Sequence, residues 1–150
     1  MLALAACTEK ADGKLWSDDH RVDSEDYRKM TEESQTAFGR GDYDRVYELV
    51  LPYAEAGIAE AQFGIAFFVG SGYGPVNADL SVEERQAKAM VWLRRAVAQA
   101  YPKATDHLAV IYTDIEKNDT LAACWRTAAN DLDQVQRCTD LEKELLPAPP

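Results

Sequence analysis

The chain has 150 residues, of which 47% are hydrophobic, and it carries a formal net charge of −10 at pH 7. This length fits a single domain, and the excess of acidic residues lies toward both ends of the chain. Neither nucleic acid nor anionic lipid would gain from a surface of this sign, so the composition argues against both as ligands. A protein with a basic surface would be attracted, although an acidic surface that only maintains solubility agrees with the same composition.

The segment 1–7 ends in the motif Leu-Ala-Ala-Cys, in which the cysteine is Cys7. This motif resembles the lipobox of bacterial lipoproteins, which implies that Cys7 is lipidated and becomes the first residue of the mature protein. A complete signal also has a basic segment and a longer apolar one, so 1–7 is interpreted as a truncated signal. The polar, acidic segment 8–25 is the expected tether between this anchor and the domain. The alternative is a short apolar terminus with an incidental cysteine.

Apolar residues recur at helical spacing along the rest of the chain, and no stretch alternates apolar and polar residues for long enough to indicate a strand. The pattern predicts an all-α domain over 26–146, followed by a Pro-rich tail over 147–150. Seven helices are expected, at 25–39, 42–56, 59–70, 82–99, 103–116, 119–129 and 132–146. Asp42 is the expected N-cap of the second helix, and Pro52 is expected to kink that helix or to begin a new turn within it.

Two stretches of the sequence resemble each other at a spacing of 43 residues. In both, small and large apolar residues occupy matched offsets, which lets paired helices approach closely and interlock. At the spacing of 43 residues, Ala61, Ile65, Ala66 and Val69 match Ala104, Leu108, Ala109 and Tyr112. Behind each of these stretches stands an aromatic helix pattern, in which Ala89, Trp92 and Ala96 match Ala122, Trp125 and Ala129, 33 residues later. Self-similarity of this kind predicts a solenoid of helix pairs, in which each pair buries its apolar face against its neighbours.

The first copy resembles the Sel-one-like repeat family, which is related to the tetratricopeptide repeats. The likeness is carried by Ile65-Ala66, the turn Gly72-x-Gly74, the helix residues Lys88, Ala89, Trp92 and Ala96, and the segment 100–104. It covers roughly 42–129 and implies a short right-handed solenoid of antiparallel helix pairs. The second copy departs from the family pattern, because it has no glycine turn and is ten residues shorter between its apolar anchor and its tryptophan.

Cys124 and Cys138 lie equally far from Asp131, in the expected turn between the last two helices. Residues placed in this way face each other in an antiparallel helix hairpin, which is the arrangement that a disulfide requires. We therefore predict a disulfide that fixes the final helix as a cap; two buried free thiols are the alternative. No C-x-x-C motif is present, so redox catalysis and a zinc site have no support.

No motif of a known catalytic type is present, and the two histidines do not supply one. Asp106 and His107 are neighbours on an expected helix and point in different directions, while His20 lies in the tether. The sequence contains no G-x-S-x-G, H-E-x-x-H or phosphate-binding motif. We therefore expect no enzymatic activity, no cofactor and no metal ion.

The expected interaction surface uses residues that the repeat does not need for its core. The connector between the third and fourth helices is longer than the family's, and long loops in compact repeats are often functional. The expected partner-binding residues are Tyr73, Pro75, Val76 and Asn77 in this connector, and Gln62, Phe67, His107 and Val110 on a concave helical face. Phe67 is the surplus aromatic beside Phe68, so it is either a binding hot spot or packs beneath the connector.

The fold and the lipobox together predict a non-enzymatic interaction module that is lipid-anchored in the periplasm. Small lipid-anchored proteins with Sel-one-like repeats include immunity proteins, so this likeness implies a protein that neutralises a secreted toxin such as a phospholipase effector. The first alternative is a periplasmic scaffold or regulator of a signalling or cell-wall assembly. The second is an enzyme or small-molecule binder. The expected partner is a secreted toxin or an envelope protein with a basic surface.

Overall fold

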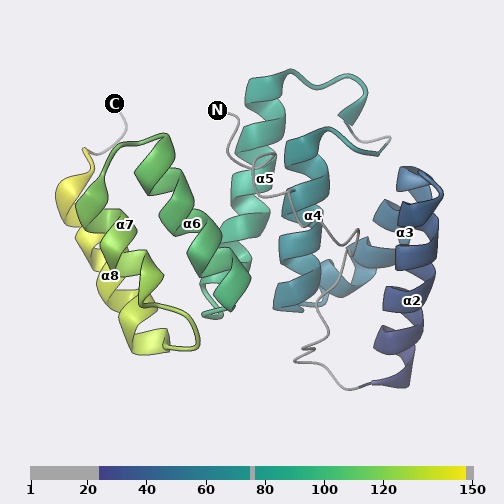
Figure 1. The fold of residues 1–150 in the computed structure, drawn as a ribbon, viewed down its shortest axis with the longest axis horizontal. Helices are drawn as coiled ribbons and strands as arrows, with labels where there is room; N and C mark the ends of the chain where they lie inside the picture. Colours follow the sequence, from purple (N-terminus) through teal and green to yellow (C-terminus); the bar gives the residue numbers. More distant parts are fainter. Residues whose placement is uncertain (1–23, 75–76, 148–150) are drawn as a thin grey trace.

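The computed structural model describes residues 24–74 and 77–147. Within this part of the chain it contains seven helices and no strand, which confirms the predicted all-α class (Figure 1). The helices are α2 (Glu25–Gly39), α3 (Tyr43–Glu55), α4 (Ala59–Ser71), α5 (Val82–Val97), α6 (Pro102–Asp114), α7 (Asp119–Arg126) and α8 (Leu132–Leu145). The predicted signal at 1–7, nearly all of the tether at 8–25 and most of the tail at 147–150 lie outside the described residues.

Short polar side chains begin several of the helices. The Asp42 carboxylate accepts a hydrogen bond from the backbone N–H of Arg45 at 3.2 Å, so Asp42 caps α3 as predicted. Ser81 begins α5 with a complete capping box, in which the Glu84 carboxylate accepts from the Ser81 N–H at 2.7 Å. Pro52 lies inside α3, and the helix continues past it, so no separate helix begins there.

The helices follow one another in sequence order along the long axis of the molecule, and each helix runs across that axis. The series begins with α2 and α3 at one end and finishes with α7 and α8 at the other (Figure 1). The extensive contacts between elements all join helices that are consecutive in the sequence, and they are largest between α4 and α5. Because α4 has a neighbour on both sides, it is buried around almost its whole circumference. Even its Glu60 is buried, and it accepts a hydrogen bond from the Tyr27 hydroxyl of α2 at 2.9 Å.

Most of the apolar residues that define the sequence repeat lie in the core. The buried anchors are Ala61, Ile65, Ala66 and Val69 of α4, and Ala104, Leu108, Ala109 and Tyr112 of α6. Trp125 of α7 is fully buried, as expected for a core residue. Trp92 of α5 is only partly buried, and the Arg95 guanidinium lies 4.5 Å from the centre of its ring. Trp92 therefore lies at the edge of the core, where it has an exposed cation as a neighbour.

Candidate interaction site

Aromatic side chains gather where α4 ends, and together they form the aromatic cluster: Phe38, Tyr43, Phe67, Phe68 and Tyr73. Tyr43 and Tyr73 stack with ring centroids 4.3 Å apart, and Phe67 lies 6.1 Å from Tyr73. Phe38 and Phe68 meet edge to face at 6.2 Å. Phe68 is fully buried, whereas the other four rings are only partly buried. The cluster therefore extends from the core to the molecular surface.

The end of α4 brings Tyr73 back toward the cluster. Gly72 has a φ of +79°, in the left-handed region that favours glycine, and its N–H donates to the carbonyls of Phe68 and Val69. The Tyr73 N–H then donates to the Phe68 carbonyl at 3.0 Å, which completes a common way of ending a helix. As a result the chain reverses direction, and the Tyr73 ring packs on Tyr43 instead of pointing away from the fold.

Three of the predicted partner-binding residues are partly exposed. They are Phe67 and Tyr73 of the aromatic cluster, and Val110 of α6. The structure brings Phe67 and Tyr73 side by side, whereas Val110 lies on a helix that makes no extensive contact with α4. Pro75 and Val76 lie outside the described residues. The candidate site therefore reduces to the exposed part of the aromatic cluster.

The other three predicted residues are buried, so the expectation that they face a partner is wrong. Gln62, Asn77 and His107 have exposed fractions of 5%, 6% and 4%. Gln62 is used within the fold, because its amide nitrogen donates to a carbonyl of α3 at 3.2 Å and its oxygen accepts from Gln99 at 2.9 Å. Asn77 donates to the backbone carbonyl of Tyr73, so its amide is used in a hydrogen bond within the connector.

His107 is enclosed between α6 and α4, with its ring approximately edge-on to Phe63 at 6.0 Å. Neither of its ring nitrogens has a hydrogen-bond partner in the described structure. Burial without a compensating partner lowers the pKa of His107 to about 4, from 6.5. The imidazole is therefore neutral at physiological pH and packs as an apolar group.

Acidification from pH 7.5 to 5 is expected to lower the free energy of unfolding by about 2 kcal/mol through His107 alone. The unfolded chain binds the proton near pH 6.5, whereas the folded protein leaves His107 neutral down to about pH 4. Stability is therefore lost as the pH falls between these values. Urea unfolding at several pH values measures the effect. The variant His107→Leu binds no proton at this position, and a pH dependence equal to that of the wild type would contradict the assignment.

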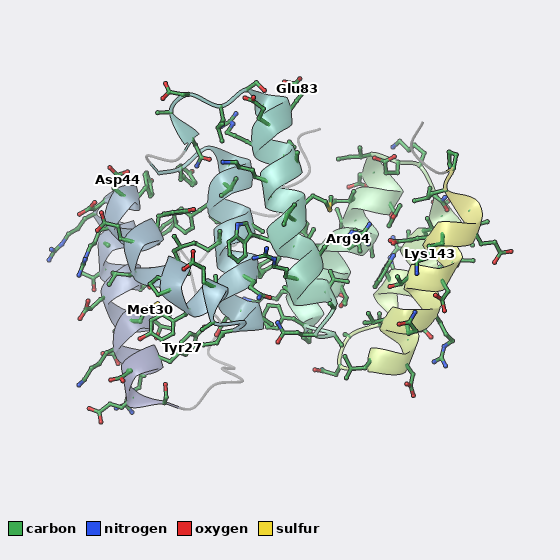
Figure 2. All side chains as sticks on the ribbon, turned by 180° about the vertical axis from the view of Figure 1, so that it is seen from behind. Tyr27, Met30, Asp44, Glu83, Arg94 and Lys143 are labelled. Carbon is green, nitrogen blue, oxygen red and sulfur yellow. A yellow bond between two sulfur atoms is a disulfide. The ribbon has the colours of Figure 1, made fainter. Side chains whose placement is uncertain are left out.

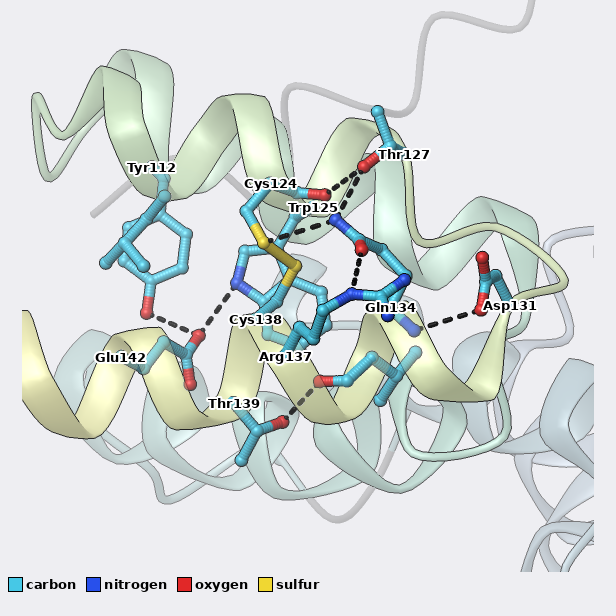
Figure 3. Close-up of a disulfide and its surroundings, with 12 residues drawn as sticks. Tyr112, Cys124, Trp125, Thr127, Asp131, Gln134, Arg137, Cys138, Thr139 and Glu142 are labelled. Carbon is cyan, nitrogen blue, oxygen red and sulfur yellow. Dashed lines mark hydrogen bonds between the residues drawn. A yellow bond between two sulfur atoms is a disulfide. The ribbon is translucent and has the colours of Figure 1, made fainter.

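A single carboxylate at the other end of the molecule collects hydrogen bonds from three helices. Both oxygens of Glu142 on α8 accept from Nη1 of Arg94 at 2.8 Å. One of them also accepts from Tyr112 at 2.7 Å and from the Trp125 indole at 2.9 Å (Figure 3). Figure 2 shows Arg94 on the side of α5 that faces these C-terminal helices. Glu142 therefore links α8 to α5, α6 and α7 at once.

The chemistry of this carboxylate cluster is structural. Burial and the hydrogen bond to Glu142 raise the pKa of Tyr112 to about 12, so its hydroxyl stays protonated and continues to donate. Arg94 neutralises the charge of the carboxylate, and these groups are hydrogen-bonded to one another. Sequence reasoning missed the cluster, because Glu142 looks the same as Glu144, its exposed neighbour on the same helix.

The disulfide between Cys124 of α7 and Cys138 of α8 confirms the pairing that the spacing predicts (Figure 3). The two Cα atoms are 5.7 Å apart, which is within the ordinary range for a disulfide. The Asp131 carboxylate accepts from the Gln134 N–H at 2.9 Å and caps α8, so the turn lies where the symmetric spacing requires. The last two helices are therefore joined covalently as well as by packing.

Two open hollows of about 480 and 360 Å³ lie beside α8 and α2, and neither is lined by a histidine or a cysteine. The described part of the chain holds no cluster of side chains suited to a metal ion, and none of its helices has the length and apolarity to cross a membrane.

Comparisons with protein-family models, curated proteins and solved structures find no match.

Proposed function

We propose that this protein is a non-enzymatic interaction module whose protein partner docks on the exposed part of the aromatic cluster. The observation that carries the proposal is the adjacency of Phe67 and Tyr73, two partly exposed rings fixed by a fully buried Phe68. Aromatic side chains that are held rigidly at the edge of a core lose little entropy on binding, which is why they are frequent hot spots. The acidic charge of the chain favours a partner with a basic surface.

We further propose that the helices form a short right-handed solenoid of antiparallel pairs, of the Sel-one-like repeat kind. Two observations support this architecture. The extensive contacts join helices that are consecutive in the sequence, and the anchors matched at a spacing of 43 residues are buried in both copies. In such folds each unit stabilises its neighbours, so the terminal units need special protection from water. The disulfide between α7 and α8 supplies a covalent link in the last unit.

The specific role that we propose is neutralisation of a secreted toxin, such as a phospholipase effector, by a lipid-anchored immunity protein of the periplasm. The Leu-Ala-Ala-Cys motif at Cys7 supports the anchor, although Cys7 lies outside the described residues. The disulfide supports an oxidising compartment. A periplasmic scaffold or regulator is the second candidate, because an acidic helical module with an exposed aromatic site suits that role too.

The substitutions Phe67→Asp and Tyr73→Ala are each expected to weaken partner binding by more than about 1 kcal/mol, because each removes a rigid ring from the docking surface. The purified, disulfide-bonded protein is immobilised, proteins from the envelope and the secreted fraction are captured, and the affinity of the retained partner is measured for every variant. A secreted enzyme that is bound tightly and inhibited supports the immunity role, whereas a signalling or cell-wall protein supports the scaffold role.

The matched control is Leu132→Asp, which changes a side chain that is 63% exposed at the opposite end of the molecule. This variant is expected to bind like the wild type. Thermal melting of all three variants shows whether the fold is intact. Wild-type affinity in both cluster variants would rule out the aromatic cluster as the docking surface.

A further inference from the structure

Arg85, in the first turn of α5, lies against the glycine that ends α4. A Cβ atom built on Gly72 would lie only 1.8 Å from Nη1 of Arg85 and 3.0 Å from its Cζ. The guanidinium therefore occupies space that is available only because residue 72 has no side chain. This close approach holds Arg85 at the end of α4, beside the aromatic cluster, since Tyr73 is the residue that follows Gly72.

Two donors at this position make no hydrogen bond within the described residues. The Nε atom of Arg85 and the hydroxyl of Ser71, which precedes Gly72, are both buried and make no hydrogen bond. No carboxylate of the described chain lies within ion-pair distance of Arg85. Arg94, the other partly buried arginine, differs sharply because it bonds both oxygens of Glu142. Buried donors in native proteins are nearly always paired, so this pair of donors requires an explanation.

Capping of α4 does not explain the position of Arg85. Three of the last four carbonyls of α4 already have donors: the Tyr73 N–H serves Phe68, the Gly72 N–H serves Val69 at 3.2 Å, and the Gln86 side chain serves Gly70 at 3.2 Å. Arg85 is therefore not needed by these three carbonyls, and its buried Nε–H donates to none of them.

We propose that Arg85 and Ser71 form a carboxylate-binding site, which receives an acidic side chain of the partner that docks on the aromatic cluster. The planar guanidinium presents two parallel N–H groups that match the two oxygens of a carboxylate, and the hydroxyl adds a third donor. The inference rests on the proposed function, because it places the acidic side chain next to Tyr73.

The site is tested first without the partner, by following the arginine Nε–Hε signals in NMR spectra while sodium acetate replaces sodium chloride at constant ionic strength. The Arg85 signal, identified by its loss in Arg85→Gln, is expected to shift and saturate. The signal of Arg95, an exposed arginine on the same helix, is expected to move little. Ser71→Ala should weaken acetate binding about threefold, as expected for the loss of one hydrogen bond.

Three results would overturn the inference. An Arg85 shift that grows without saturation, or that equals the Arg95 shift, would indicate general ion screening only. A saturable response to inorganic phosphate but none to acetate would reject a carboxylate as the ligand. The third is an unchanged affinity of Arg85→Gln for the captured partner, when a loss of about tenfold or more is expected. If Phe67→Asp still weakens that partner, the proposed function stands and only the carboxylate site is lost.

Discussion

Replacement of Glu142 by leucine is expected to reduce the free energy of unfolding by about 3 kcal/mol, the lower end of the range for breaking a buried ion pair. The Glu142 side chain is only 11% exposed and accepts from three different side chains, so its loss removes the acceptor of each one. The Arg94 side chain is 38% exposed, and water can therefore solvate part of the charge that is left behind. This partial solvation places the estimate at the lower end of the range.

Urea unfolding of matched variants measures this effect. Glu144→Leu, at an exposed position on the same helix, is the control and should change stability by less than about 0.5 kcal/mol. The double variant Arg94→Met/Glu142→Leu should recover much of the loss, because no buried charge is then left without its partner. The two side chains act independently if Arg94→Met lowers the free energy of unfolding by the same amount in Glu142→Leu as in the wild type. That result would contradict their role as a buried pair.

The helices could be predicted from the sequence because apolar spacing reports which face of each segment is buried. The carboxyl ends of the helices were harder to predict, and three of the predicted helices run two or three residues too far. The reason is local: Ala100, Lys117 and Asn130 follow these helices with positive φ angles of 53°, 50° and 58°. A glycine at such a position would have indicated the end of the helix, but alanine, lysine and asparagine are weaker signals.

The site could be predicted only in part, because burial depends on neighbours that the repeat pattern does not specify. Gln62 lies between core anchors and was expected at the surface, yet α4 packs against both α3 and α5 and has no free polar face. Glu142 is the reverse case, because no role was predicted for a residue that is buried and hydrogen-bonded to three side chains. It occurs in an acidic helix of ordinary appearance, and its donors Arg94 and Trp125 lie 48 and 17 positions earlier in the chain. Polar partners at such separations have no periodic signature.

The disulfide was predictable because its geometry is local. Two cysteines placed symmetrically about one turn face each other in any tight helix hairpin, whatever the rest of the fold does. The position of Arg85 was not predictable for the opposite reason. Its contact with Gly72 depends on how α5 returns across the end of α4, and 13 residues separate the two positions.

Reduction of the Cys124–Cys138 disulfide is expected to lower the free energy of unfolding by about 3 kcal/mol, the chain-entropy estimate for a loop of this length. The effect should be concentrated in α8, because among the described residues the extensive helix contacts of α8 are with α7 alone. Hydrogen exchange of backbone amides should therefore accelerate more in α8 than in α4 when a dithiol reductant is added. The double variant Cys124→Ala/Cys138→Ala should exchange like the reduced protein and should not respond to the reductant.

The disulfide and the carboxylate cluster are expected to depend on each other, since Cys138 and Glu142 are one helical turn apart on α8. While the disulfide is intact, α8 is held near α7 even if Glu142 is replaced. Once it is reduced, the hydrogen bonds to Glu142 become the main polar link of α8 to α5 and α6. Glu142→Leu should therefore accelerate exchange in α8 far more under reducing conditions than under oxidising ones. Equal acceleration in both conditions would show that the two links act independently, and that the disulfide contributes nothing to holding Glu142 in place.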